Sequence, residues 1–118
     1  MKSRAEVVEQ ELGVRLPEEY KTFLRTYGIY EYAGGEVYGV TEDMVDLGEI
    51  PCVIGATRNA QKICPLPKEY LVVNHTGFED EMVCLDAKTG RVYLIGQGTS
   101  KLIAESFDEW FTRDILDK

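Results

Sequence analysis

The sequence of 118 residues lacks any apolar run close to the roughly twenty residues that a membrane-spanning helix needs. Its opening stretch, MKSRAEVVEQE, alternates charges where a secretory signal peptide would carry a hydrophobic segment. Both absences favour a chain that works inside the cell without a membrane anchor. We therefore expect a cytoplasmic protein.

Cysteine and histidine are scarce, which argues against a disulfide framework and a metal site. Cys52, Cys64 and Cys84 are an odd number in a chain without an export signal, so we expect reduced thiols. None of them forms the close C-x-x-C pair typical of zinc sites. We expect no metal and no other cofactor.

Catalytic motifs are also missing. A nucleophilic pair would require Cys64 or Cys84 within hydrogen-bond reach of His75, the single histidine, and a third group to orient its ring. Cys84 instead lies in the apolar run EMVCLD, as a small buried hydrophobe does. GQGTSK lacks the spacing of a phosphate-binding loop, and we interpret it as a flexible connection. We expect no enzymatic activity, and a Cys-His enzyme is the alternative.

Positive charge is in deficit: 13 Lys and Arg face 21 Asp and Glu, for a net charge of −8. That sign repels phosphate backbones and anionic membranes, so we expect neither direct nucleic-acid binding nor membrane binding. Between Arg25 and Arg58 there is no basic residue at all. The acids in this gap are Glu31, Glu36, Glu42, Asp43, Asp46 and Glu49. They form either a solvated face or a partner-binding surface, and the charge pattern alone favours the former.

Apolar spacing predicts helices near both ends of the chain. A capping box at Ser3 and Glu6 begins a first helix over residues 4–12. LPEEYKTFLRTYG predicts a second, with Pro17 in the first helical position and one apolar stripe ended by Gly28. A second capping box, beginning at Ser106, starts a C-terminal helix with its own apolar stripe.

The middle of the chain favours strands. EYLVV, EMVCLD and RVYLI are apolar, β-rich runs, and DAKTG between the last two suits a tight hairpin turn. Their hydrophobicity indicates that helices cover both faces in part. A turn at Gly34 and Gly35 leads into a short strand over 36–40, and ATRNAQKI predicts a short helix. The pattern predicts an α+β fold in one domain.

Tyrosine is the remaining distinctive residue, because it combines a large rigid ring with one polar tip and is enriched at protein interfaces. Tyr20 and Tyr27 lie on the second helix's stripe, and we assign them to the core. Tyr30, Tyr32 and Tyr38 lie among the acids of this gap, and we expect them to be exposed. The predicted partner-binding residues are Tyr30, Tyr32, Glu36, Tyr38, Glu42, Asp43, Asp46 and Glu49.

Four segments together resemble the SUKH superfamily: LGVRLPEEYKTFLRTYG, YLVVNHTG, VCLDAKTGRVYLIG and IAESFDEWFTRDIL. The superfamily includes bacterial immunity proteins and relatives of a yeast cell-wall synthesis regulator, and the YobK-like immunity proteins look most similar. The resemblance extends from about Leu12 to Leu116. The matching residues are Leu16, Pro17, Tyr20, Phe23, Gly28, Leu85, Asp86, Ser106, Phe107 and Trp110, all explained as caps, turns or core.

The resemblance implies a single SUKH-like domain over residues 1–118, with helices around a largely antiparallel sheet and the C-terminal helix packed on that sheet. It also implies a noncatalytic immunity protein that binds and neutralises a cognate polymorphic toxin, often a nuclease. An acidic inhibitor can occupy the basic surface with which a nuclease holds phosphates, so the acidic segment becomes a candidate interface. The alternative is a protein-interaction module in cell-wall or stress regulation. The partner's identity and the oligomeric state stay open.

Overall fold

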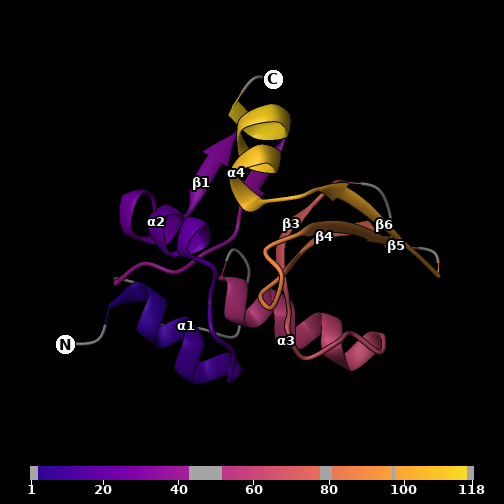
Figure 1. The fold of residues 1–118 in the computed structure, drawn as a ribbon, viewed down its shortest axis with the longest axis horizontal. Coiled ribbons are helices and arrows are strands. Elements are labelled where there is room, and N and C mark those ends of the chain that lie inside the picture. Colours follow the sequence, from indigo (N-terminus) through magenta and orange to yellow (C-terminus); the bar gives the residue numbers. More distant parts are fainter. Residues whose placement is uncertain (1–2, 43–51, 78–80, 97, 117–118) are drawn as a thin grey trace.

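The computed structural model describes residues 3–42, 52–77, 81–96 and 98–116. It contains a two-stranded and a four-stranded sheet, both antiparallel, with helices before, between and after them, which confirms the predicted α+β fold. Figure 1 shows the larger sheet on one side of the molecule and the N-terminal helices on the other. In chain order the elements are α1 (Arg4–Leu12), α2 (Glu18–Thr26), β1 (Tyr30–Tyr32), β2 (Gly35–Val37), α3 (Val53–Ile63), β3 (Tyr70–His75), β4 (Glu81–Asp86), β5 (Val92–Gly96), β6 (Thr99–Ala104), α4 (Phe107–Trp110) and the π-helix η1 (Phe111–Leu116).

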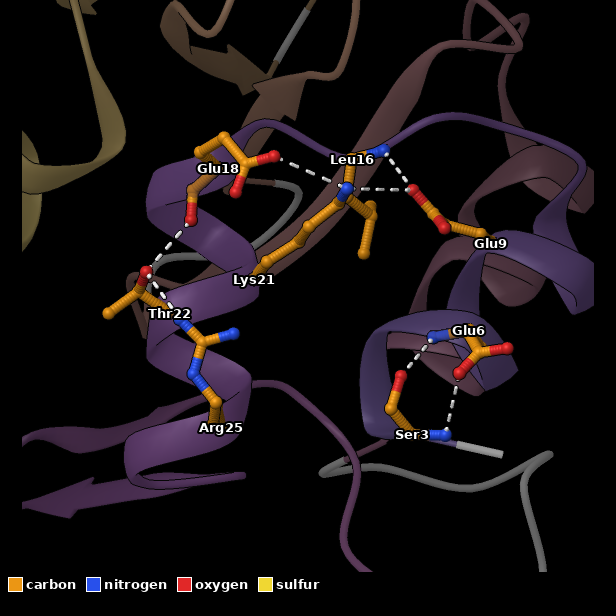
Figure 2. Close-up of polar contacts among 8 residues, drawn as sticks. All are labelled: Ser3, Glu6, Glu9, Leu16, Glu18, Lys21, Thr22 and Arg25. Carbon is orange, nitrogen blue, oxygen red and sulfur yellow. Dashed lines mark hydrogen bonds and ion pairs between the residues drawn. The ribbon is translucent and has the colours of Figure 1, made fainter. Parts of the chain in front are cut away.

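The N-terminal helix α1 has the bounds that its capping box predicts. Ser3 Oγ accepts the Glu6 amide at 3.2 Å, and the Glu6 carboxylate accepts the Ser3 amide at 3.2 Å (Figure 2). Glu9 then ties α1 to the following turn, because its carboxylate accepts the Leu16 amide at 2.8 Å and lies 3.8 Å from Lys21 Nζ (Figure 2). These contacts hold α2 at a fixed angle to α1.

The second helix buries the expected stripe of Tyr20, Phe23 and Leu24. Pro17 is the N-cap of the helix and not its first helical residue as predicted, so the helix begins one residue later, at Glu18. The assignment of Tyr27 to the core is wrong in part, because the helix ends at Thr26 and the Tyr27 side chain is 42% exposed.

Neither β1 nor β6 was predicted as a strand. β1 pairs with β2, and β2 is shorter than the expected strand over 36–40. β6 occupies part of the segment interpreted as a flexible connection, and it extends the sheet to the order β3-β4-β5-β6. The predicted turn between β4 and β5 is present: Gly90 has φ 82°, and the Asp86 carboxylate accepts the Lys88 amide at 2.9 Å.

Helices cover both faces of the larger sheet in part, as expected. α3 packs along β3, and the buried Val72 amide donates to the Thr57 hydroxyl oxygen on α3 at 2.9 Å. The C-terminal helix contacts β6 and buries Trp110, which is 2% exposed. No helix in the described part of the chain has both the length and the apolar character needed to cross a membrane.

The segment after β2 crosses close to the end of α2 and also contacts the larger sheet. The Val40 amide donates to the Gly28 carbonyl at 3.1 Å, and a Cβ on Gly39 would collide with that same carbonyl oxygen. The Tyr38 amide donates to the Val73 carbonyl at 2.7 Å, so the segment after β2 covers the edge of β3. This crossing positions the β1–β2 hairpin against the sheet.

Candidate surface for partner binding

The β1–β2 hairpin separates the predicted tyrosines from the acids. Side chains opposite one another in an antiparallel pair lie on one face, and neighbours along a strand lie on opposite faces. Tyr30 is opposite Val37, and Glu31 is opposite Glu36. The hairpin therefore has an aromatic face and an acidic face, and the predicted surface of mixed tyrosines and carboxylates does not form here.

The aromatic face points inward. Tyr30 packs edge-on against Tyr27 and Phe111, with ring centroids 5.2 and 5.3 Å apart. The Tyr32 hydroxyl accepts the Asn74 side-chain amide at 3.0 Å, and the same amide donates to the Glu36 carbonyl at 2.7 Å. Tyr30 and Tyr32 are half-buried, so they hold the hairpin in place and leave only part of each ring to solvent.

The acidic face is formed by Glu31 and Glu36, which we call the acidic pair. Glu31 is exposed and Glu36 is half-buried. Among the ion pairs of the described residues, none includes either carboxylate. Like charges directly opposite on a sheet are destabilising, so folding alone gives no reason for this pair. The sequence places both residues in the acidic gap, but only Glu36 is among the predicted partner-binding residues, because the pairing with Glu31 depends on the unpredicted strand β1.

Tyr38 contradicts the expectation of exposure, since it is 6% exposed. Its carbonyl accepts the buried Tyr20 hydroxyl at 2.7 Å, and its own hydroxyl lies 2.7 Å from His75 Nδ1. Burial, together with the nearby Glu36 and Tyr32, raises the pKa of Tyr38 to about 12. Tyr38 is a buried link between α2 and β3 and offers no surface to a partner.

Glu42 has a partner within the chain. Arg4 Nη2 lies 2.8 Å from Glu42 Oε2, Arg4 Nε lies 3.0 Å from Oε1, and Arg4 Nη1 donates to the Leu24 carbonyl at 2.6 Å. Glu42 thus fastens the segment after β2 to α1 and α2. Asp43, Asp46 and Glu49 lie outside the described residues.

A shallow trough of about 520 Å³ lies beside the hairpin and crosses all four strands of the larger sheet. It begins at Tyr32 and Asn74 and reaches the outer strand at Lys101 and Ile103. Its floor includes Val83 and Leu94, and its wall is the C-terminal helix with Trp110, Arg113, Asp114 and Ile115. It therefore provides an apolar floor with charged margins, on the Tyr32 side of the hairpin and on the other face from the acidic pair.

A larger groove of about 830 Å³ lies on the opposite face of the sheet, under α3. It is mainly apolar, with Ala56, Ala60 and Ile63 from α3 facing Met82 and Ile95. His75 and Glu81 lie at its polar end. Desolvation by burial lowers the pKa of His75 below its ordinary value, so the ring is neutral at pH 7.

The alternative of a Cys-His enzyme finds no support in the geometry of these residues. His75 Nδ1 is engaged by Tyr38, and Cys64 Sγ donates to the Ala60 carbonyl at 3.3 Å. Burial, with a smaller effect of Cys64, raises the pKa of Cys84 to about 12, so its thiol stays protonated and is a poor nucleophile. Within the described ranges, no three His, Cys, Asp or Glu residues gather as metal ligands.

Comparison with families of known proteins gives one match over nearly the whole chain. The family SUKH_5, described as SMI1-KNR4 cell-wall, matches residues 2–116. No individually curated protein matches the sequence significantly. The family match agrees with the superfamily that the sequence segments resemble, while the likeness to YobK-like proteins stays a prediction.

Proposed function

This chain belongs to the SMI1-KNR4 family of the SUKH superfamily, and from that membership we propose that it is a noncatalytic immunity protein that binds and neutralises a cognate protein toxin. The observation that carries the proposal is the acidic pair on the outer face of the hairpin. Its two carboxylates lie opposite one another without a cation among the described residues.

A basic partner would supply the missing cation. In the free chain the two carboxylates repel, and a Lys or Arg of the partner placed between them replaces that repulsion by two attractions. The net charge of −8 adds long-range attraction and raises the association rate with a basic protein. Toxins that hold phosphates, such as nucleases, have basic surfaces that would be attracted in this way.

The trough would add an apolar area to the partner-binding surface. Standard protein interfaces combine an apolar centre with a polar rim and bury about 800 Å² on each partner. A hairpin face alone is too small for this. The trough, with Val83 and Leu94 on its floor, begins at Tyr32, on the other face of the hairpin from the acidic pair, so a partner that reaches around the hairpin would cover both.

A second candidate is a regulatory interaction module, which the cell-wall description of the family favours. It would bind through the same surface without protecting any cell from a toxin. Protection therefore separates the two candidates.

The test is co-expression with the toxin domain encoded beside the gene for this chain. Wild type and Glu69→Lys should protect the cells, whereas Glu31→Lys should protect less at equal protein levels. Glu69 is exposed and stands before β3, at the opposite end of that strand from Asn74, so it provides the same charge change away from the hairpin. Failure of wild type to protect would contradict the immunity role. Equal protection by both variants would remove the acidic pair from the interface.

A further inference from the structure

The outer strand β6 has an open edge. In the order β3-β4-β5-β6 it pairs with β5 on one side, and no described strand pairs with it on the other. The first four of its six residues, Thr99–Leu102, are all exposed. At its far end, Arg113 Nη2 donates to the Ile103 carbonyl at 2.7 Å. An open edge carries backbone donors and acceptors that another strand can pair with.

This edge lies where the two hollows of the surface meet. Thr99 and Ser100 line the groove under α3, and Lys101 and Ile103 line the trough on the other face. A strand added beside β6 would alternate its side chains between the two, because successive residues point to opposite faces. A helix placed there could fill one hollow and would leave the backbone edge unpaired. The geometry therefore favours an extended segment.

Charge on this edge differs from that of the rest of the chain. Among the described ion pairs none includes Lys101, whereas Arg113 beside it pairs with Glu109 and Asp114. A second copy of this chain is disfavoured as the occupant, because each copy has a net charge of −8 and a Lys on an edge strand opposes self-pairing. A carboxylate on a foreign strand complements Lys101.

We propose that β6 accepts an extended segment of the partner protein as a fifth strand of the sheet. The segment has apolar side chains toward the groove and a carboxylate toward Lys101. The inference rests on the proposed function, because it names a second contact of the same partner. The acidic pair takes a cation on the hairpin and Lys101 takes an anion on β6, so the two contacts of opposite sign fix the partner's orientation.

Hydrogen exchange on the free chain and on its complex with the toxin domain tests strand addition. The complex should slow exchange of the outward-facing amides in Thr99–Leu102 by about tenfold or more, because they gain backbone partners. Lys101→Glu should weaken binding about three- to tenfold. Lys88→Glu is the matched control, since Lys88 is exposed in the turn between β4 and β5.

Three results would overturn the proposal. If a complex forms and the β6 amides exchange as in the free chain, strand addition is wrong while the immunity role stands. If no complex forms, both fail. If these amides become protected in the free chain as its concentration rises, a second copy covers the edge.

Discussion

Reversing one charge should have opposite effects on stability at Glu31 and at Glu42, although both side chains are exposed glutamates in the same acidic segment. Glu31 faces Glu36, so Glu31→Lys turns a cross-strand repulsion into an attraction. Cross-strand pairs contribute about 0.2–1 kcal/mol, and we expect the free energy of unfolding to rise by about 0.5–1 kcal/mol. Glu42→Lys breaks a bidentate ion pair and places a second cation beside Arg4. This change should lower the free energy of unfolding by a similar amount.

Thermal unfolding measures both shifts. For a chain of this length, 1 kcal/mol corresponds to roughly 4 °C in Tm, so we expect Glu31→Lys to melt about 2–4 °C above wild type and Glu42→Lys about 2–4 °C below it. Both shifts should shrink at about 1 M salt, where the screening length falls to about 3 Å. Shifts of the same sign at low salt would refute the reasoning: two decreases would show that Glu31 and Glu36 do not repel as their register implies, and two increases would show that Arg4 does not stabilise Glu42.

Three further perturbations test the interior. Tyr20→Phe removes the donor to the buried Tyr38 carbonyl and should lower the free energy of unfolding by about 1–3 kcal/mol in urea titration; an unchanged midpoint would contradict the hydrogen bond. Gly39→Ala places a Cβ against the Gly28 carbonyl and should lower it by about 3 kcal/mol or more, so wild-type stability would contradict the close crossing. The pKa of His75 is lowered in the fold, so the unfolded chain binds its proton first as pH falls, and stability is lost below about pH 6.5. His75→Gln should flatten this pH dependence, and an equal slope between pH 7 and 5 in both proteins would contradict the shift.

The sequence predicts the helices well where local signals are complete. The capping box of Ser3 and Glu6 and the Gly13 terminus define α1 to the residue, because these signals act within one turn of the chain. Pairing between β4 and β5 is predictable for the same reason, since a five-residue turn joins them. Sequence reasoning also identified the superfamily, through the order of four such local segments.

Strands β1 and β6 were missed because each depends on a neighbour. YEY is too short to show alternation, and it becomes a strand by pairing with β2. TSKLIA has only one buried residue, so no apolar pattern distinguishes it from a loop until β5 lies beside it.

For the candidate surface, the sequence predicted only that it would be negatively charged. The absence of Lys and Arg between Arg25 and Arg58 indicated an acidic surface. Which carboxylates remain without a cation depends on contacts far apart in sequence: Glu42 is neutralised by Arg4, and Glu31 meets Glu36 across a turn. Tyr38 was misjudged because its burial comes from α2 and β3, neither of which adjoins it in the chain.

The most direct test of the proposed function is a binding titration between this chain and the toxin domain encoded next to its gene, at low and high salt. We predict tight one-to-one binding whose association rate falls steeply as salt rises, and a slower association for Glu31→Lys than for Glu69→Lys. Tight binding that is indifferent to salt would keep the immunity role and move the interface away from the acidic pair. No binding at either salt would contradict the immunity role and leave the regulatory module as the better account.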